Sequence, residues 1–167
     1  MRLPLSLLLS GLALTAVACA PVAVPAPTLL ATGYATAPVA NYDWYLHTDG
    51  DEARLAYGLR DSDDLRLGLD CRRGSGRLAL SALGETGAAS EIGLESGGEA
   101  AVYPATAETS ELVDGIVLSA TAPAAAPVFQ RFQAVGWLAH RQADDIHAYV
   151  AHSGSTTRIA RFFAFCG

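Results

Sequence analysis

Leu65-Arg66-Leu67-Gly68-Leu69-Asp70-Cys71 is the stretch that most clearly indicates the fold, because it alternates apolar and polar residues without a break. Successive side chains of a β-strand point to opposite faces, so this alternation predicts a strand with one buried face. Leu65, Leu67, Leu69 and Cys71 would share the buried face, with Arg66, Gly68 and Asp70 on the other. The pattern therefore places Cys71 in the core.

Similar short patterns lie on both sides of this strand, and turn residues separate them. Asp-Gly and Gly-Gly pairs favour tight hairpin turns. We predict hairpins across Asp49-Gly50, Gly97-Gly98 and Asp114-Gly115. The expected strands around them are Trp44–His47, Ala53–Tyr57, Leu78–Ala82, Ile92–Leu94, Ala100–Tyr103, Ile116–Ala120, Trp137–His140 and Ile146–Val150.

Two helices are expected late in the chain. Phe129, Phe132 and Val135 fall near helical spacing, and Gly136 is a typical helix stop. Ser155 is a favourable cap for a closing helix. The closing helix would place its apolar stripe in the core: Ile159, Phe162, Phe163 and Cys166.

These elements predict a mainly β fold, with strands first and helices late. Alternating βαβ units are absent, so we expect an antiparallel sandwich or a partly open barrel. A short helix and the C-terminal helix would pack on it. Residues 42–167 would form this single β-rich globular domain.

The N-terminus has the layout of an export signal. Met1-Arg2 precedes an apolar run from Leu3 to Val17, and Ala16-Val17-Ala18 comes directly before Cys19. This segment resembles the lipobox of bacterial lipoproteins, although a lipobox usually has Leu where Ala16 stands. The resemblance implies that residues 1–18 are a signal peptide and that Cys19 becomes the acylated first residue.

Other outcomes remain open for this segment. Ala16-Val17-Ala18 also fits ordinary secretory cleavage at the same bond, which would give a soluble periplasmic protein. The residue directly after Cys19 is Ala20 and not Asp. By resemblance to the enterobacterial sorting pattern, this favours the outer membrane, facing the periplasm, as the location of the protein. A transmembrane span is not expected, because Pro21, Pro25 and Pro27 end the apolar run.

Residues 19–41 contain Pro, Ala, Val and Thr and no charged side chain. Proline favours extended backbone, so we interpret this segment as a tether that reaches up to ~60 Å at ~3.1 Å per residue. The chain carries 11 Arg and no Lys against 17 Asp and Glu, a formal net charge of −6. An acidic chain is a poor partner for nucleic acid or anionic headgroups, so membrane contact would come through the lipid anchor only.

The chain has three cysteines, an odd number for an exported protein. If Cys19 carries lipid, Cys71 and Cys166 remain, and an oxidising periplasm favours a disulfide between them. Two buried free thiols are the alternative.

Two polar loops are the binding candidates. The turn that contains Arg72, Arg73 and Arg77 holds Gly74-Ser75-Gly76, which suits a solvated hairpin tip or a small anion site. The other loop contains Asp61, Asp63 and Asp64, which suit a turn or a hard cation, although the EF-hand pattern is absent.

His140 and His147 would face each other across the last hairpin, if Arg141 pairs with Ile146. Such a pair could hold a transition metal, but two ligands do not make a structural zinc site. We therefore expect two exposed imidazoles, with Trp137, Ala139, Ile146, Ala148 and Val150 on the buried face. We predict no metal and no cofactor.

The nucleophile elbow G-x-S-x-G and an activated cysteine are missing from the sequence. The function predicted is an exported envelope lipoprotein that acts as a non-catalytic binding module. Its partner would be an envelope protein or another macromolecule. A periplasmic enzyme inhibitor and a hydrolase with an unrecognised site are the alternatives.

Overall fold

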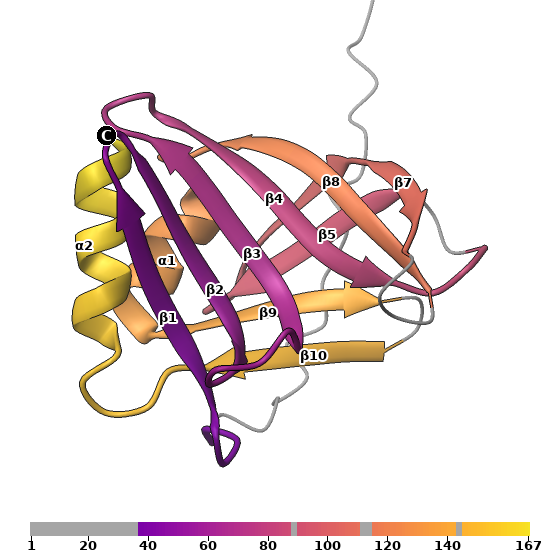
Figure 1. Ribbon diagram of the computed structural model, residues 1–167, viewed down its shortest axis with the longest axis horizontal. Coiled ribbons are helices and arrows are strands. Elements are labelled where there is room, and N and C mark those ends of the chain that lie inside the picture. Colours follow the sequence, from indigo (N-terminus) through magenta and orange to yellow (C-terminus); the bar gives the residue numbers. More distant parts are fainter. Residues whose placement is uncertain (1–36, 88–89, 111–114, 143–144) are drawn as a thin grey trace, which may run out of the picture.

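The computed structural model describes residues 37–87, 90–110, 115–142 and 145–167. They form two antiparallel sheets and two helices, and the sheets do not close into a barrel (Figure 1). The predicted mainly β class and the sandwich are therefore confirmed. The signal peptide, Cys19 and most of the proposed tether lie outside the described residues.

The larger sheet has six strands and the smaller sheet has four. The larger sheet has the order β1 (Tyr42–Asp49), β2 (Glu52–Leu59), β3 (Leu65–Arg72), β4 (Arg77–Gly84), β8 (Ile116–Pro123), β7 (Thr106–Thr109). The smaller sheet has the order β10 (Asp145–Val150), β9 (Trp137–Gln142), β5 (Glu91–Ser96), β6 (Glu99–Pro104).

The hairpins predicted from Asp49-Gly50 and Gly97-Gly98 are present. Asp49 pairs with Glu52, and Gly50 has φ 54°, in the left-handed region that glycine adopts without strain. Strand β7 was not predicted, because its four residues are all exposed and show no apolar alternation. It pairs with β8, and the connection between them is partly outside the described residues.

The alternation that predicted β3 fails at its first residue. Leu67, Leu69 and Cys71 are buried as expected, but Leu65 is 38 % exposed. The pairing of β2 with β3 shifts register between Tyr57 and Gly58, so that Gly58 pairs with Leu65. This irregularity interrupts the two-residue period at the point where Leu65 enters the sheet.

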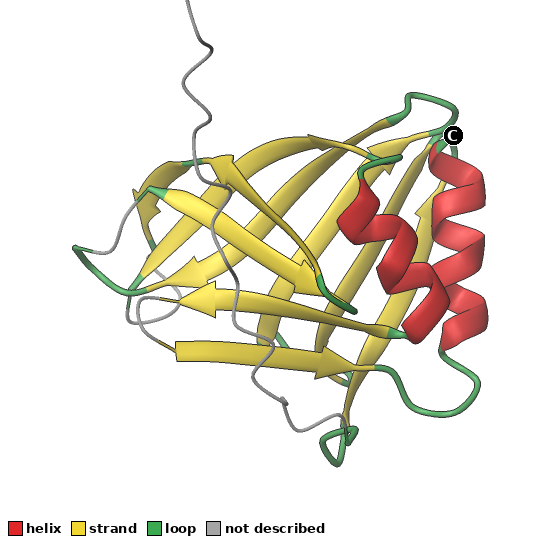
Figure 2. Ribbon diagram, turned by 180° about the vertical axis from the view of Figure 1, so that it is seen from behind, coloured by secondary structure: helices red, strands yellow, loops and turns green. Residues whose placement is uncertain are grey.

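Helix α1 (Pro127–Val135) ends at Gly136, which has φ 75° and donates its backbone N–H to the carbonyl of Phe132. It packs on β5, β6 and β9, whereas α2 (Thr156–Cys166) packs on β1, β2 and β3. Both helices lie at the same end of the sandwich, as Figure 2 shows from behind. The predicted stripe of α2 is buried: Ile159, Phe162, Phe163 and Cys166.

Trp44 joins the two layers at the centre of the core. Its ring lies 5.4 Å from that of Tyr57 and 4.7 Å from that of Phe132, between ring centres. Its indole Nε1 donates a hydrogen bond of 3.1 Å to the carbonyl of Tyr149 in the other sheet. A buried aromatic side chain with a satisfied polar atom contributes several kcal/mol of burial free energy, about 25 cal/mol per Å².

Cys71 and Cys166 form the predicted disulfide, with a Cα–Cα distance of 5.7 Å. The alternative of two free thiols is therefore wrong. Next to it, Gly74 N donates to the carbonyl of Phe165 at 3.0 Å and Gly76 N to that of Cys166 at 2.8 Å. The turn after β3 thus satisfies carbonyls that the end of α2 leaves without helical partners. Among the described residues, no helix is long and apolar enough to cross a membrane.

Candidate functional site

The two predicted loops lie at opposite ends of β3 and do not form one site. The turn with Arg72, Arg73 and Arg77 follows the strand, and the loop with the aspartates precedes it. Eight residues of strand separate them by about 25 Å, at ~3.3 Å per residue.

Arg73 has a structural position in its turn. Its guanidinium lies 4.0 Å from the centre of the Phe165 ring, 3.2 Å from a carboxylate oxygen of Asp51 and 3.1 Å from the carbonyl of Gly50. The glycine amides of the turn bond to the end of α2, as described above. These amides are therefore not available as an anion nest.

Arg72 and Arg77 line a groove of about 690 Å³ on the outer face of the larger sheet. Its floor carries the Arg54–Asp70 ion pair, with 2.7 Å between nitrogen and oxygen. Arg77 reaches Thr121 with a 3.3 Å hydrogen bond, whereas Arg72 has no polar side-chain partner within the described ranges. The groove also contains other titratable side chains: His47, Asp49 and Glu52.

The three aspartates of the other loop have three different environments. Asp61 is exposed and has φ 54°. Asp63 lines a shallow recess of about 260 Å³ on the outer face of the larger sheet. Asp64 accepts a hydrogen bond from the Tyr42 hydroxyl and pairs with Arg66 at 2.9 Å. Because Asp64 is used internally, the loop does not present three carboxylates to one ion.

A cavity of about 880 Å³ opens between the two sheets near that loop. Its walls come from the start of β1, the end of β2, the start of β3, the end of β4 and most of β10. The aromatic and titratable side chains that line it are Tyr42, Tyr57, Arg66, Glu85, His147 and Tyr149.

Three tyrosine rings stack along this cavity. The ring of Tyr57 lies 5.9 Å from that of Tyr42 and 4.8 Å from that of Tyr149, between centres. Burial, followed by the charge of Asp43, raises the pKa of Tyr57 to about 12, and burial raises that of Tyr149 to about 12. Both phenols are therefore neutral donors at physiological pH.

Tyr57 is 2 % exposed, and its buried hydroxyl has no hydrogen-bond partner among the described residues. Buried polar groups are nearly always paired, so an unpaired buried donor on a residue that lines a cavity is a feature that a ligand would explain. The sequence does not indicate this site, because the three tyrosines are far apart along the chain. Tyr57 lay inside a predicted strand, but nothing local indicated its neighbours.

Arg66 lies at the mouth of the cavity and forms an ion pair with Asp64. Two guanidinium nitrogens of Arg66 contact Asp64, at 2.9 and 3.2 Å, and Arg66 also lies 5.8 Å from the centre of the Tyr42 ring. The positive charge at the mouth is thus compensated by its own carboxylate.

His140 and His147 pair in the predicted register, with Arg141 opposite Ile146. The predicted exposure is confirmed for His147 and wrong for His140, while Ala139 and Val150 are buried as predicted. Leu138 and His140 are buried on the inward face, at 0 % and 1 % exposure, while His147 is exposed. Both faces of the smaller sheet carry small or apolar residues, so its alternation did not identify the inward face. The described residues contain no group of three His, Cys, Asp or Glu side chains placed to hold a metal ion.

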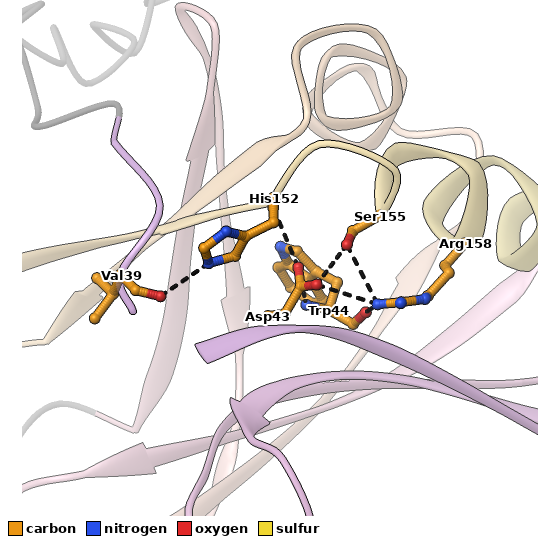
Figure 3. Close-up of polar contacts among 6 residues, drawn as sticks. All are labelled: Val39, Asp43, Trp44, His152, Ser155 and Arg158. Atoms are coloured by element: carbon orange, nitrogen blue, oxygen red, sulfur yellow. Dashed lines mark hydrogen bonds and ion pairs between the residues drawn. The ribbon is translucent and has the colours of Figure 1, made fainter. Parts of the chain in front are cut away.

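Asp43 is the centre of a polar cluster that joins β1 to the start of α2 (Figure 3). It accepts hydrogen bonds from the Ser155 hydroxyl, from Arg158 at 3.1 Å and from the backbone amides of Trp44 and His152 at 2.8 and 3.2 Å. Helix α2 begins after Ser155 as predicted, but the Ser155 side chain does not cap it.

This cluster contains Ser, His and Asp but not the geometry of a catalytic triad. The Ser155 hydroxyl donates to Asp43, and a ring nitrogen of His152 lies 3.0 Å from the carbonyl of Val39. A nucleophilic serine needs its hydroxyl next to an imidazole base, and here the imidazole points to Val39 (Figure 3). The cluster fixes the helix to the sheet.

No protein-family model matches the chain, and neither does any curated protein or any solved structure.

Proposed function

We propose that this protein is an exported envelope lipoprotein whose β-sandwich is a non-catalytic binding module. Its partner would be an envelope protein or another macromolecule, bound at the outer-face groove of the larger sheet. The observation that carries the proposal is the position of Arg72 and Arg77. They line an open recess of about 690 Å³ at the ends of β3 and β4.

The charges of this groove suit a protein surface. Arg54 and Asp70 are already paired, while Arg72, Asp49 and Glu52 have no ion-pair partner in the part of the chain that the structure describes. Unpaired charges of both signs, held on strand ends, favour a partner with a complementary mixed pattern. Nucleic acid would require a surplus of positive charge instead.

The arrangement of Ser155, His152 and Asp43 supports binding over hydrolysis, because the serine is not paired with the imidazole. The position of Val39 at the cavity mouth also fits a domain suspended from its N-terminal side. Under this proposal, residues 1–18 are removed and Cys19 carries the lipid. The outer membrane, facing the periplasm, is the proposed location.

The anchor is tested by mass spectrometry of the mature protein and by membrane fractionation. We expect a diacylated or triacylated Cys19 at the N-terminus, and release from the membrane fraction in Cys19→Ser. An unmodified Cys19 would leave the soluble periplasmic alternative.

The binding surface is tested by capture from envelope extract with the mature domain. Arg72→Glu with Arg77→Glu should abolish capture, whereas Arg161→Glu, an exposed charge reversal on α2, should not. Binding should then be reproduced with the purified partner. Equal capture by both variants would refute the groove as the binding site. Turnover of a hydrolase substrate by the purified domain would favour an enzyme.

A further inference from the structure

We propose that the cavity between the sheets binds an uncharged, planar, ring-containing molecule whose hydrogen-bond acceptor meets the hydroxyl of Tyr57. This site is separate from the groove, because it lies at the other end of β3 and between the layers. The inference therefore goes beyond the proposed partner binding and does not depend on it.

The walls of the cavity select a flat molecule. Tyr42, Tyr57 and Tyr149 form a stacked row, and small or apolar residues of β4 and β10 lie among the other lining positions. Aromatic faces bind ring systems through offset stacking and burial of apolar area. About 880 Å³ falls in the size range of small-molecule sites, which are mostly apolar with a few polar groups that fix orientation.

The Tyr57 hydroxyl supplies the orienting polar group. It is a buried donor without a partner within the described ranges, on a residue that lines the cavity. A phenol with a raised pKa stays protonated, so it offers a proton and selects an acceptor such as a carbonyl oxygen. A ligand without an acceptor would leave this hydroxyl unsatisfied.

The charges at the mouth argue against an ionised ligand. Arg66 is neutralised by Asp64 at 2.9 Å, and Glu85 adds an exposed carboxylate beside the cavity. An anion would meet this negative charge with no uncompensated guanidinium. A cation would meet Arg66, which already lies over the Tyr42 ring.

The test uses one ring skeleton with and without an acceptor. 9-Fluorenone is flat, neutral and carries a carbonyl, fluorene lacks the carbonyl, and fluorenone-2-carboxylate adds a negative charge. Equilibrium dialysis against the mature protein should give saturable binding with fluorenone tightest. Tyr57→Phe should weaken fluorenone about threefold to tenfold, the value of one neutral hydrogen bond, and leave fluorene unchanged.

Tyr103→Phe is the matched control, because Tyr103 also has a buried hydroxyl without a described partner and does not line this cavity. It should not change the affinity for fluorenone. Ala148→Phe should block the binding of all three probes, in protein whose circular dichroism shows that it is folded. The proposal is overturned if fluorenone does not bind saturably, if it binds no tighter than fluorene or the carboxylate, or if Tyr57→Phe has no effect. Partner capture through Arg72 and Arg77 is measured separately, so the two proposals fail independently.

Discussion

His140 and His147 face each other across the β9–β10 pair, yet His140 is 1 % exposed and His147 is exposed. Burial, and secondly the nearby His147, lowers the pKa of His140 to about 4. The Nε2 atom of His140 has no hydrogen-bond partner among the described residues. His140 is thus a neutral side chain of the core at physiological pH.

This position predicts a loss of stability in mild acid. An unfolded histidine titrates near 6.5, so between pH 6.5 and about 4 the unfolded state binds the extra proton. The stability that the neutral, buried His140 provides is fully present above pH 6.5. It is lost as the pH falls towards 4, and the total loss is up to about 3 kcal/mol. Urea unfolding at several pH values should show this slope, and His140→Leu should flatten it. Equal slopes in both proteins would contradict the prediction.

Asp43→Asn should destabilise the protein by about 1–3 kcal/mol, because hydrogen bonds to a charged acceptor are among the stronger ones. Burial alone would raise the pKa of Asp43, but hydrogen bonds from Ser155, Trp44 and His152 and the charge of Arg158 hold this pKa below its ordinary value of 3.8. The stabilisation is therefore present above pH 3.8 and is lost as the pH falls below it.

Denaturant unfolding at pH 7 measures the loss, and hydrogen exchange should show faster opening of the first turn of α2. The control is Asp61→Asn, an exposed aspartate for which the structure gives no side-chain contact. If Asp61→Asn lowers the free energy of unfolding as much as Asp43→Asn does, the polar cluster around Asp43 is not the cause of the loss.

Reduction of the Cys71–Cys166 disulfide should cost about 4–5 kcal/mol, in the chain-entropy account for a loop of 95 residues. Wild-type protein should unfold at a lower denaturant concentration in the presence of reductant. The Cys71→Ala, Cys166→Ala double variant should unfold at that lower denaturant concentration even without reductant, and adding reductant should not change its unfolding. A response of the double variant to reductant would assign the effect elsewhere.

Tyr57→Phe should leave the unliganded protein equally stable or stabilise it by up to about 1–3 kcal/mol, because it removes a buried hydroxyl without a described partner. Tyr103→Phe should behave in the same way. Thermal and denaturant unfolding without ligand are the measurements. A clear destabilisation by Tyr57→Phe would mean that its hydroxyl has a structural bond, and would remove the reason to expect a ligand there.

The sequence was informative where a local pattern and a buried face coincide. The strand with Leu67 and Leu69, the stop at Gly136 and the stripe with Phe162 were all predicted, because burial imposes a period of 2 or 3.6 residues on them. The disulfide was predicted from the odd number of cysteines and the expected oxidising compartment, with both residues in apolar patterns, and these need no knowledge of the fold.

The parts that were missed depend on contacts between distant segments. The shift at Gly58 turned Leu65 outwards, and no residue near Leu65 indicates a shift in the neighbouring strand. The tyrosine-lined cavity requires the pairing of β1 with β2 and the position of β10, which only the complete fold specifies. Likewise, Asp43 and Ser155 are near opposite ends of the domain's sequence and come into contact only in the complete fold.

The two ends of strand β1 lie at two different sites, the cavity and the groove. Tyr42, at its first residue, lines the cavity together with Val39, and Asp49, at its last residue, lines the groove. Their separation is about 25 Å along the strand. A domain attached through the residues before Val39 would have the cavity near its point of attachment and the groove at its far end. A small molecule in the cavity and a protein in the groove would then occupy the same domain without competing for space.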